Sequence, residues 1–155
     1  MSVGRVSDAE VYRQHARDLV RFATVLVGSD DAQDVVANAF LRCLSSNGWQ
    51  EVTDRRAYLF RVVANEARNL KRSAARRRVR EASVGGDPAV EIPSPRPDVV
   101  AAIGGLSVRQ RSVVYLAYWE DMTDQMIAEY LGIGSGSVRR HLGRARSKLR
   151  EVLDE

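Results

Sequence analysis

Apolar residues recur every three or four positions along most of the chain, which is the spacing of amphipathic helices. The first such stretch follows Ser7, and Glu10 stands three residues after it, so the pair forms a capping box that marks a helix start. We expect this helix to run to about Val27, where Gly28 breaks it. Its predicted buried face consists of Tyr12, Ala16, Leu19, Val20, Ala23, Leu26 and Val27.

A second helix is predicted from Asp30, because two aspartates at its start suit the positive end of the helix dipole. Its regular apolar face predicts core positions at Ala32, Val35, Val36, Ala39, Phe40, Cys43 and Leu44. The opposite face carries Asp34, Asn38 and Leu41, so a leucine stands where solvent is expected. One exposed leucine is ordinary. Beside an acid and an amide it is also typical of a protein-docking patch, and the pattern leaves both interpretations open.

A loop at 46–54 contains Trp49 and precedes a third helix, predicted from Asp54 to about Arg80. One side of this helix is apolar. The other side carries arginines and one asparagine in register: Arg61, Asn65, Arg68, Arg72 and Arg76. Such a row suits a phosphate backbone, with the amide able to read a base edge, and the alternative is a solvated basic face. Trp49 either covers the core or helps to line a pocket.

Residues 81–97 differ from the rest because they hold two adjacent glycines and all four prolines of the chain, which forbid regular structure. We expect a flexible, partly extended linker there, between two small domains at 5–80 and 98–155. A short helix at 98–103 is predicted to open the second domain. The predicted fold class is therefore all-α, with two small helical domains.

The second domain is predicted to end in a helix-turn-helix. Ser107 and Gln110 form a capping box for a helix that should reach about Glu120. Thr123 is expected to cap the next helix, which should end at Leu131.

The turn of this motif is predicted at Gly132, where the chain leaves the first helix with a positive φ. Ala128 is small enough to let the two helices cross closely, and Ser135 is expected to cap the second helix, which should run to about Leu153. Its inward stripe comprises Val138, Leu142, Ala145 and Leu149.

The outward side of the last helix carries basic residues beside small ones. They are Gly136, Arg140, Gly143, Arg144 and Ser147, with Arg139 on the flank. Arginines beside glycines suit insertion into a DNA major groove, because guanidinium can bridge guanine O6 and N7 and glycine permits close approach. The alternative is a solvated basic helix.

Charge distribution supports an anionic partner. The chain has 155 residues and a net charge of +4, and of its 24 Lys and Arg, seven lie in 68–80 and six in 139–150. Two separate basic clusters suggest two contacts on one long polyanion.

Other functional classes are disfavoured by composition. Cys43 is the single cysteine, so no intrachain disulfide can form. There is no long apolar run, so we expect a cytoplasmic protein without membrane contact. We find no metal-ligand cluster, no phosphate-cradling glycine loop and no Ser/His/Asp arrangement, so no enzyme activity, metal or cofactor is expected.

Three stretches, in this order, resemble the extracytoplasmic-function sigma factors, the minimal bacterial type with only sigma regions two and four. They are DDAQDVVANAFLRC at 30–43, RRAYLFRVVANEARNLKRS at 55–73, and the stretch 106–150 that ends in RARSKL. The resemblance covers nearly every residue outside the linker. It implies a promoter-specificity subunit that directs RNA polymerase core to −10 and −35 promoter elements and helps to melt them.

The resemblance also implies roles for individual residues. Asp34, Asn38 and Leu41 would face the clamp coiled coil of the polymerase β′ subunit. Residues implied to meet the −10 element are Trp49, Arg61, Asn65, Arg68, Asn69 and Arg72. Asn65 would hold a flipped non-template base, with the loop 48–54 completing the pocket. Residues implied to meet the −35 element are Ser137, Arg139, Arg140, Gly143 and Arg144.

The implied partners are promoter DNA and core polymerase, through the β′ clamp coiled coil and the β flap. An anti-sigma factor is a further candidate partner. An alternative is an autonomous helix-turn-helix regulator that binds duplex DNA without polymerase. An RNA-binding adaptor that uses the 68–80 cluster is a further alternative, but it would leave the C-terminal groove reader unexplained.

Overall fold

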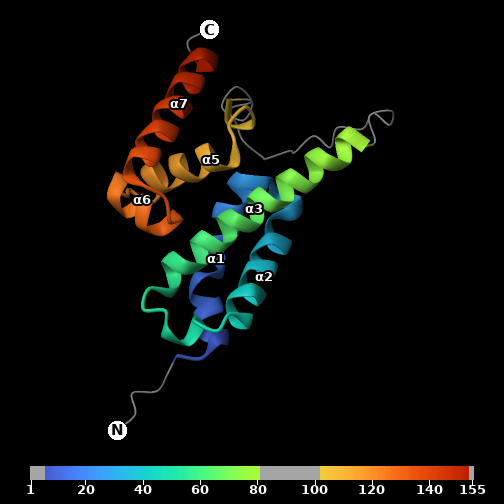
Figure 1. Cartoon of the computed structure of the whole chain (residues 1–155), viewed down its shortest axis with the longest axis vertical. Coiled ribbons are helices and arrows are strands. Elements are labelled where there is room, and N and C mark those ends of the chain that lie inside the picture. Colours follow the sequence, from blue (N-terminus) through green and yellow to red (C-terminus); the bar gives the residue numbers. More distant parts are fainter. Residues whose placement is uncertain (1–5, 81–101, 154–155) are drawn as a thin grey trace.

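The computed structural model describes residues 6–80 and 102–153, and no strand occurs within these ranges. The N-terminal half contains α1 (Asp8–Val27), α2 (Ser29–Ser45), the 3-10 turn η1 (Trp49–Glu51) and the long α3 (Arg55–Arg80). The C-terminal half contains α5 (Val108–Val114), the π-helix η2 (Tyr115–Trp119), α6 (Asp124–Leu131) and α7 (Ser135–Leu153). The all-α prediction is confirmed (Figure 1). The predicted linker at 81–97 and most of the short helix predicted at 98–103 lie outside the described residues.

Side-chain caps begin three helices where the sequence predicted them. The hydroxyls of Ser7 and Thr123 each accept a hydrogen bond of 3.2 Å from the backbone N–H three residues later. Ser107 and Gln110 make the full reciprocal capping box. These caps satisfy backbone donors that have no partner inside the helix, which fixes where α1, α5 and α6 start.

The start of α7 differs from the prediction. The carbonyl oxygen of Gly134 accepts the backbone N–H of Val138 at 3.1 Å, and Ser135 is already helical. Ser135 is therefore the first residue of the helix rather than its cap.

The core of the N-terminal half lies between α1, α2 and α3. Phe22 and Phe60 are fully buried at its centre, with their rings 4.9 Å apart. Phe22 was not on the predicted buried face of its helix, and for Phe60 the sequence left open whether it fills the core or stacks on unpaired bases. Phe22 also contacts Tyr115 of the C-terminal half at 5.1 Å between ring centroids. Because α1 packs on both halves, its buried surface is wider than one stripe. The predicted core residue Tyr12, at the edge of that surface, is instead exposed.

The helix predicted from Ser107 to Glu120 is interrupted by η2. The N–H of Glu120 donates to the carbonyl of Tyr115 five residues earlier, at 3.2 Å, so the last turn is wider than an α-helix. Tyr115 is buried in this turn while Tyr118 and Trp119 are exposed. The chain then turns at Asp121, whose φ is 54°.

The helix-turn-helix is formed by α6 and α7. Gly132 has a φ of 67°, as its place in the turn predicted, and its N–H donates to the carbonyl of Ala128. The predicted inward stripe of α7 is buried at Val138, Leu142 and Ala145. The outward side of α7 is left free by this packing.

The two halves pack against each other. α5 lies against α1 and α3, and α6 lies against α3 (Figure 1). We call this contact surface the seam. The sequence predicted two domains joined by a linker and gave no indication that they touch.

Candidate nucleic-acid interface

The outward side of α7 forms a cationic hollow. A cavity of about 710 Å³ is lined by Gln110, Arg139, Arg140, Gly143, Arg144, Ser147 and Lys148. The guanidinium of Arg140 donates to the hydroxyl of Ser137 at 3.0 Å, which holds it along the helix. Among the described residues, no carboxylate pairs with Arg139, Arg140 or Arg144. We call this cavity the α7 hollow. Its unpaired guanidinium groups are free to bind an anion.

The α3 residues that the resemblance implies for the −10 element divide into two groups. Asn65, Asn69 and Arg72 are exposed, and Arg68 is half-buried. Arg61 is also half-buried, but its guanidinium is engaged by α6 across the seam. All five therefore keep some exposed surface along α3, and Arg61 is the one whose polar end already has partners there.

Arg61 binds the end of α6. Its Nε donates to the carbonyl of Tyr130 at 3.2 Å and its Nη2 donates to the carbonyl of Glu129 at 2.6 Å. These carbonyls belong to the last turn of α6, where the backbone has unsatisfied acceptors and the dipole is negative. A Cβ atom at Gly132 would lie 2.9 Å from Nε of Arg61, so only glycine leaves room for this contact.

Arg56 makes a second polar link across the seam. Its Nη2 lies 3.0 Å from Glu120 of the C-terminal half and 3.4 Å from Asp18 of α1. Its Nη1 donates to the Tyr130 hydroxyl at 3.1 Å, and its guanidinium stacks on the ring of Phe60. The sequence gave no signal for this role, because the two partners in the C-terminal half are more than sixty residues away.

Arg111 makes a third link, to the end of α1. Its Nη1 donates to the carbonyl of Leu26 at 3.0 Å, and the same guanidinium donates to the carbonyls of Leu106 and Gly104, each at 3.1 Å. Burial lowers the pKa of Arg111. One signal was available in the sequence: Arg111 shares a helix face with Val108 and Tyr115, so a cation stands on an apolar side.

Aromatic residues complete the seam. The ring of Tyr115 lies stacked 6.1 Å from that of Trp119, and the guanidinium of Arg21 lies 5.3 Å from the Trp119 centroid. Arg21 belongs to α1, so this cation–π contact also joins the two halves.

Trp49 belongs to the core. It is 1% exposed, its indole N–H donates to Asp8 at 2.9 Å, and its ring lies beside those of Phe40 and Tyr58. Of the two interpretations, covering the core is the one that the structure supports. In this conformation the indole offers no face to a base, which corrects its inclusion among the −10 contacts.

A second cavity, of about 740 Å³, adjoins the loop 48–54. Its lining includes Gln50, Val52, Thr53 and Asp54 from that loop and Gln14 and His15 from α1. Asn65 does not line it. The structure therefore places a hollow at the expected loop, but does not bring Asn65 into it.

The proposed polymerase-facing side of α2 is open. Leu41 is 61% exposed, and Asp34 and Asn38 are exposed on the same side. Figure 1 shows α2 on the side of the bundle away from α6 and α7. The seam leaves this face uncovered.

The described residues offer little else for catalysis or for metal binding. Cys43 is buried, and burial raises the pKa of its thiol to about 11. Within residues 6–80 and 102–153, no group of three or more His, Cys, Asp or Glu side chains could hold a metal. No helix in these ranges has the length and apolar character that crossing a bilayer requires.

Comparison with known families finds two matches in order along the chain. Residues 11–77 match the family described as Sigma-70 region 2, and residues 97–149 match Sigma-70, region 4. The first match covers α1 to most of α3, and the second covers α5 to most of α7.

Curated relatives match the chain over nearly its whole length. The RNA polymerase sigma-E factor of Streptomyces avermitilis is 34% identical over 99% of this chain and 89% of that protein. The ECF RNA polymerase sigma factor SigL of Mycobacterium tuberculosis is 31% identical over 94% of this chain and 88% of that protein.

Solved structures match both halves together. The sigma factor RpoE in complex with the anti-sigma factor NepR from Bartonella quintana gives a TM-score of 0.75 at 21% identity, over 94% of this chain and 96% of that chain. CnrH in complex with the cytosolic domain of CnrY gives 0.61 at 25% identity, over 95% and 87%.

Proposed function

Because the chain belongs to the extracytoplasmic-function sigma factors, the promoter-specificity subunits of bacterial RNA polymerase, we propose that its two halves divide promoter reading between them. The C-terminal half reads the −35 element as duplex DNA, and the N-terminal half receives −10 bases once they leave the stack. The chain itself breaks no bond; it works by binding differently to closed and melted DNA.

The observation that carries this proposal is the α7 hollow. Arg139, Arg140 and Arg144 line it without a described acidic partner, and Gly143 leaves the helix surface low between them. Ser137 positions Arg140. Paired guanidinium donors match the two acceptors of guanine in the major groove, which makes this side of α7 the reading surface for the −35 element.

The −10 role rests on α3. Asn65, Asn69 and Arg72 are exposed along one helix, so amides that can read base edges stand beside a cation that can bind phosphate. Unpairing a base costs a few kcal/mol. Binding of the released base by these residues offsets that cost, which couples recognition of the −10 sequence to melting.

Promoter binding requires the seam to open. The two elements are centred roughly 25 base pairs apart, which is about 85 Å of duplex at 3.4 Å per base pair. In the closed arrangement Arg61 of α3 touches the last turn of α6. Fully extended, the 21 residues from 81 to 101 reach at most roughly 70 Å, which alone is short of that distance. The two halves cover the remainder, because α3 and α7 are each about 30–40 Å long at 1.5 Å per residue, so the covalent chain permits the separation.

Polymerase docking does not require opening first. The face of α2 with Asp34, Asn38 and Leu41 is exposed while the seam is closed. We therefore place polymerase binding before DNA binding: core captures the closed chain through α2, and release of the seam then frees Arg61 and lets the two halves move apart to their separate elements. RpoE and CnrH are held by anti-sigma factors in their solved complexes, so a protein of that class is a further candidate partner.

The test is co-purification with core polymerase followed by gel shift and run-off transcription on genomic promoter fragments. We expect promoter complexes and transcripts only when core is present. A specific shift of a duplex palindrome by the chain alone would overturn the proposal in favour of an autonomous helix-turn-helix regulator.

A further inference from the structure

Gln110 is buried, whereas the other residues that line the α7 hollow are exposed. It belongs to α5 and not to the helix that carries the arginines, and it is 7% exposed. Its Oε1 accepts the backbone N–H of Ser107 at 3.0 Å, which completes the capping box and fixes the amide oxygen on that side. The amide nitrogen belongs to the same planar group, so it points away from Ser107.

This amide nitrogen carries two N–H donors. No residue in the described ranges accepts a hydrogen bond from it. It is nevertheless not one of the fully buried side-chain atoms that lack a partner, which are the Tyr115 hydroxyl and Nδ1 of His141. Nε2 of Gln110 therefore reaches the surface, and the surface that Gln110 lines is the α7 hollow. Its donors are available to an acceptor from outside the chain.

Lys148 of α7 lies beside this amide. Its Nζ donates to Oε1 of Gln110 at 3.4 Å and to the carbonyl of Gly105 at 3.3 Å. An ammonium group has three N–H donors, so one remains. No carboxylate in the described part of the chain pairs with Lys148, so its charge is not neutralised there.

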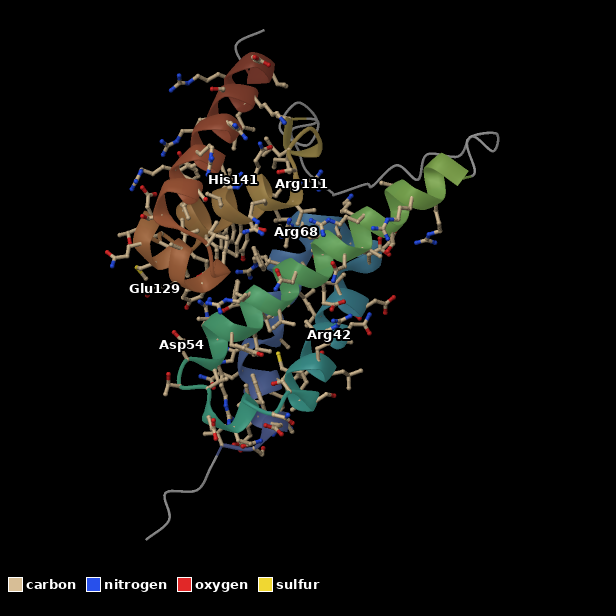
Figure 2. The ribbon with its side chains drawn as sticks, viewed as in Figure 1. Arg42, Asp54, Arg68, Arg111, Glu129 and His141 are labelled. Atoms are coloured by element: carbon tan, nitrogen blue, oxygen red, sulfur yellow. The ribbon has the colours of Figure 1, made fainter. Side chains whose placement is uncertain are left out.

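The segment behind these two residues is held by an arginine. Arg111, on α5 (Figure 2), donates to the carbonyls of Leu106 and Gly104, each at 3.1 Å. Together with the bond from Lys148 to Gly105, this binds three consecutive carbonyls. Gln110 and Lys148 are therefore held in place before a ligand arrives, which lowers the entropic cost of binding one.

We propose that Gln110 and Lys148 bind one backbone phosphate of the −35 duplex and so set the position of α7 in the major groove. Phosphate oxygens accept hydrogen bonds from amide and ammonium donors. Lys148 lies eight residues after Arg140, which is about 12 Å along the helix at 1.5 Å per residue. The major groove is about 12 Å wide, so when Arg140 meets base edges, Lys148 lies at the edge of the groove, beside the phosphates.

Gln110 and Lys148 are positioning residues, because the phosphates of all base pairs are alike and carry no sequence information. They fix where α7 lies, while Arg140 and Arg144 read the bases. This inference rests on the proposed reading of the −35 element by α7. It adds a contact from α5, which lies outside the helix-turn-helix.

Gln110→Glu separates the phosphate contact from the helix cap. Glutamate keeps an acceptor for the Ser107 N–H, so the variant should melt within a few degrees of the parent. It replaces the amide donors with a negative charge. The holoenzyme should therefore bind a −35 duplex roughly tenfold more weakly, and equally so for every −35 sequence, in competition gel shifts. Gln33→Glu makes the same charge change at an exposed amide of α2 and should bind as the parent does.

Lys148→Gln tests the charge. The slope of log affinity against log salt concentration should become shallower by about one, because one fewer counterion is released when the holoenzyme binds the −35 duplex. Arg150→Gln is the matched control, since Arg150 is exposed on α7 outside the α7 hollow, and it should keep the slope of the parent.

Unchanged affinity in Gln110→Glu would overturn the proposal, and so would a loss limited to some −35 sequences, which means contact with a base. A loss accompanied by a large fall in melting temperature would assign Gln110 to the cap alone. Equal slopes in Lys148→Gln and Arg150→Gln would mean that Lys148 only holds α7 against α5. If Gln110→Glu binds normally while Arg140→Ala loses selectivity, this inference fails and the proposed function stands.

Discussion

The guanidinium of Arg61 occupies the space that a side chain at Gly132 would need: a Cβ atom there would lie 2.9 Å from Nε of Arg61. The turn of the helix-turn-helix and α3 are therefore fitted to each other. Gly132 has a left-handed backbone with φ of 67°, and Arg61 is held in place by two carbonyls of α6.

Gly132→Ala should lower the free energy of unfolding by more than about 1–2 kcal/mol, which is the usual cost of a left-handed backbone at a residue other than glycine. The added loss comes from displacing Arg61 from its carbonyls. Urea denaturation of Gly132→Ala, Arg61→Ala and the double variant measures it: in the Arg61→Ala background only the backbone cost should remain. Gly48→Ala, with open space around its Cβ and a negative φ, is the control and should be nearly neutral. Equal effects at 132 and 48 would refute the fit.

Asn65→Ala should reduce promoter opening more than duplex binding, because in the proposed role its amide binds a base that has already left the stack. Permanganate reactivity of the −10 region reports opening, and gel shift of the holoenzyme on a duplex that cannot melt reports binding. Gln33→Ala, an exposed amide on α2, should change neither. An equal loss in both assays would rule out the base-holding role.

Arg140→Ala should relax selectivity among −35 variants by about 1–3 kcal/mol, if its contact is bidentate. Competition binding of the holoenzyme to a set of −35 sequences measures it. Arg146→Ala serves as the control, because the Arg146 guanidinium binds the Tyr118 hydroxyl at 2.7 Å and lies outside the α7 hollow. Selectivity that is unchanged in Arg140→Ala would count against groove reading by this residue.

Leu41→Asp should abolish capture by core polymerase without lowering the melting temperature by more than a few degrees. Leu41 is largely exposed, so its loss costs the folded chain little, while a buried charge in a protein interface is expensive. Val152→Asp, at the exposed end of α7, is the matched control and should still bind core. If Leu41→Asp still bound core polymerase, the docking face would have to lie elsewhere on the chain.

The Cys43 thiol should resist alkylation in the native protein at pH 8. Its pKa is raised to about 11 by burial, so at pH 8 it is almost entirely protonated as well as inaccessible. Mass spectrometry after iodoacetamide treatment should find modification only once urea unfolds the chain. Rapid modification without urea would mean that α2 opens readily.

Local features were predictable because their causes are local. The caps at Ser7, Ser107 and Thr123 and the left-handed Gly132 follow from residues within one turn of each other. The buried stripe of α7 was likewise predicted from its own periodicity.

The seam was not predictable from the sequence, because an arginine that binds DNA and one that binds a carbonyl look the same. Arg61 fits the row of polar residues on α3, yet its partners lie almost seventy residues away. Phe22 was missed for a related reason: it packs against Tyr115 across the seam, outside the single stripe expected of α1. From the sequence, Trp49 could either cover the core or line a pocket. Its hydrogen bond to Asp8, a residue distant in the sequence, shows that it belongs to the core.

Arg61 and Arg111 join the two halves by donating hydrogen bonds to main-chain carbonyl groups, which every amino acid carries. Replacing the side chain at Glu129 or Leu26 therefore leaves the acceptor in place as long as the helix persists. The two surfaces can diverge in sequence without losing these contacts. Residues in contact usually show correlated substitutions. We expect no such correlation at these positions among homologues that keep the same closed form.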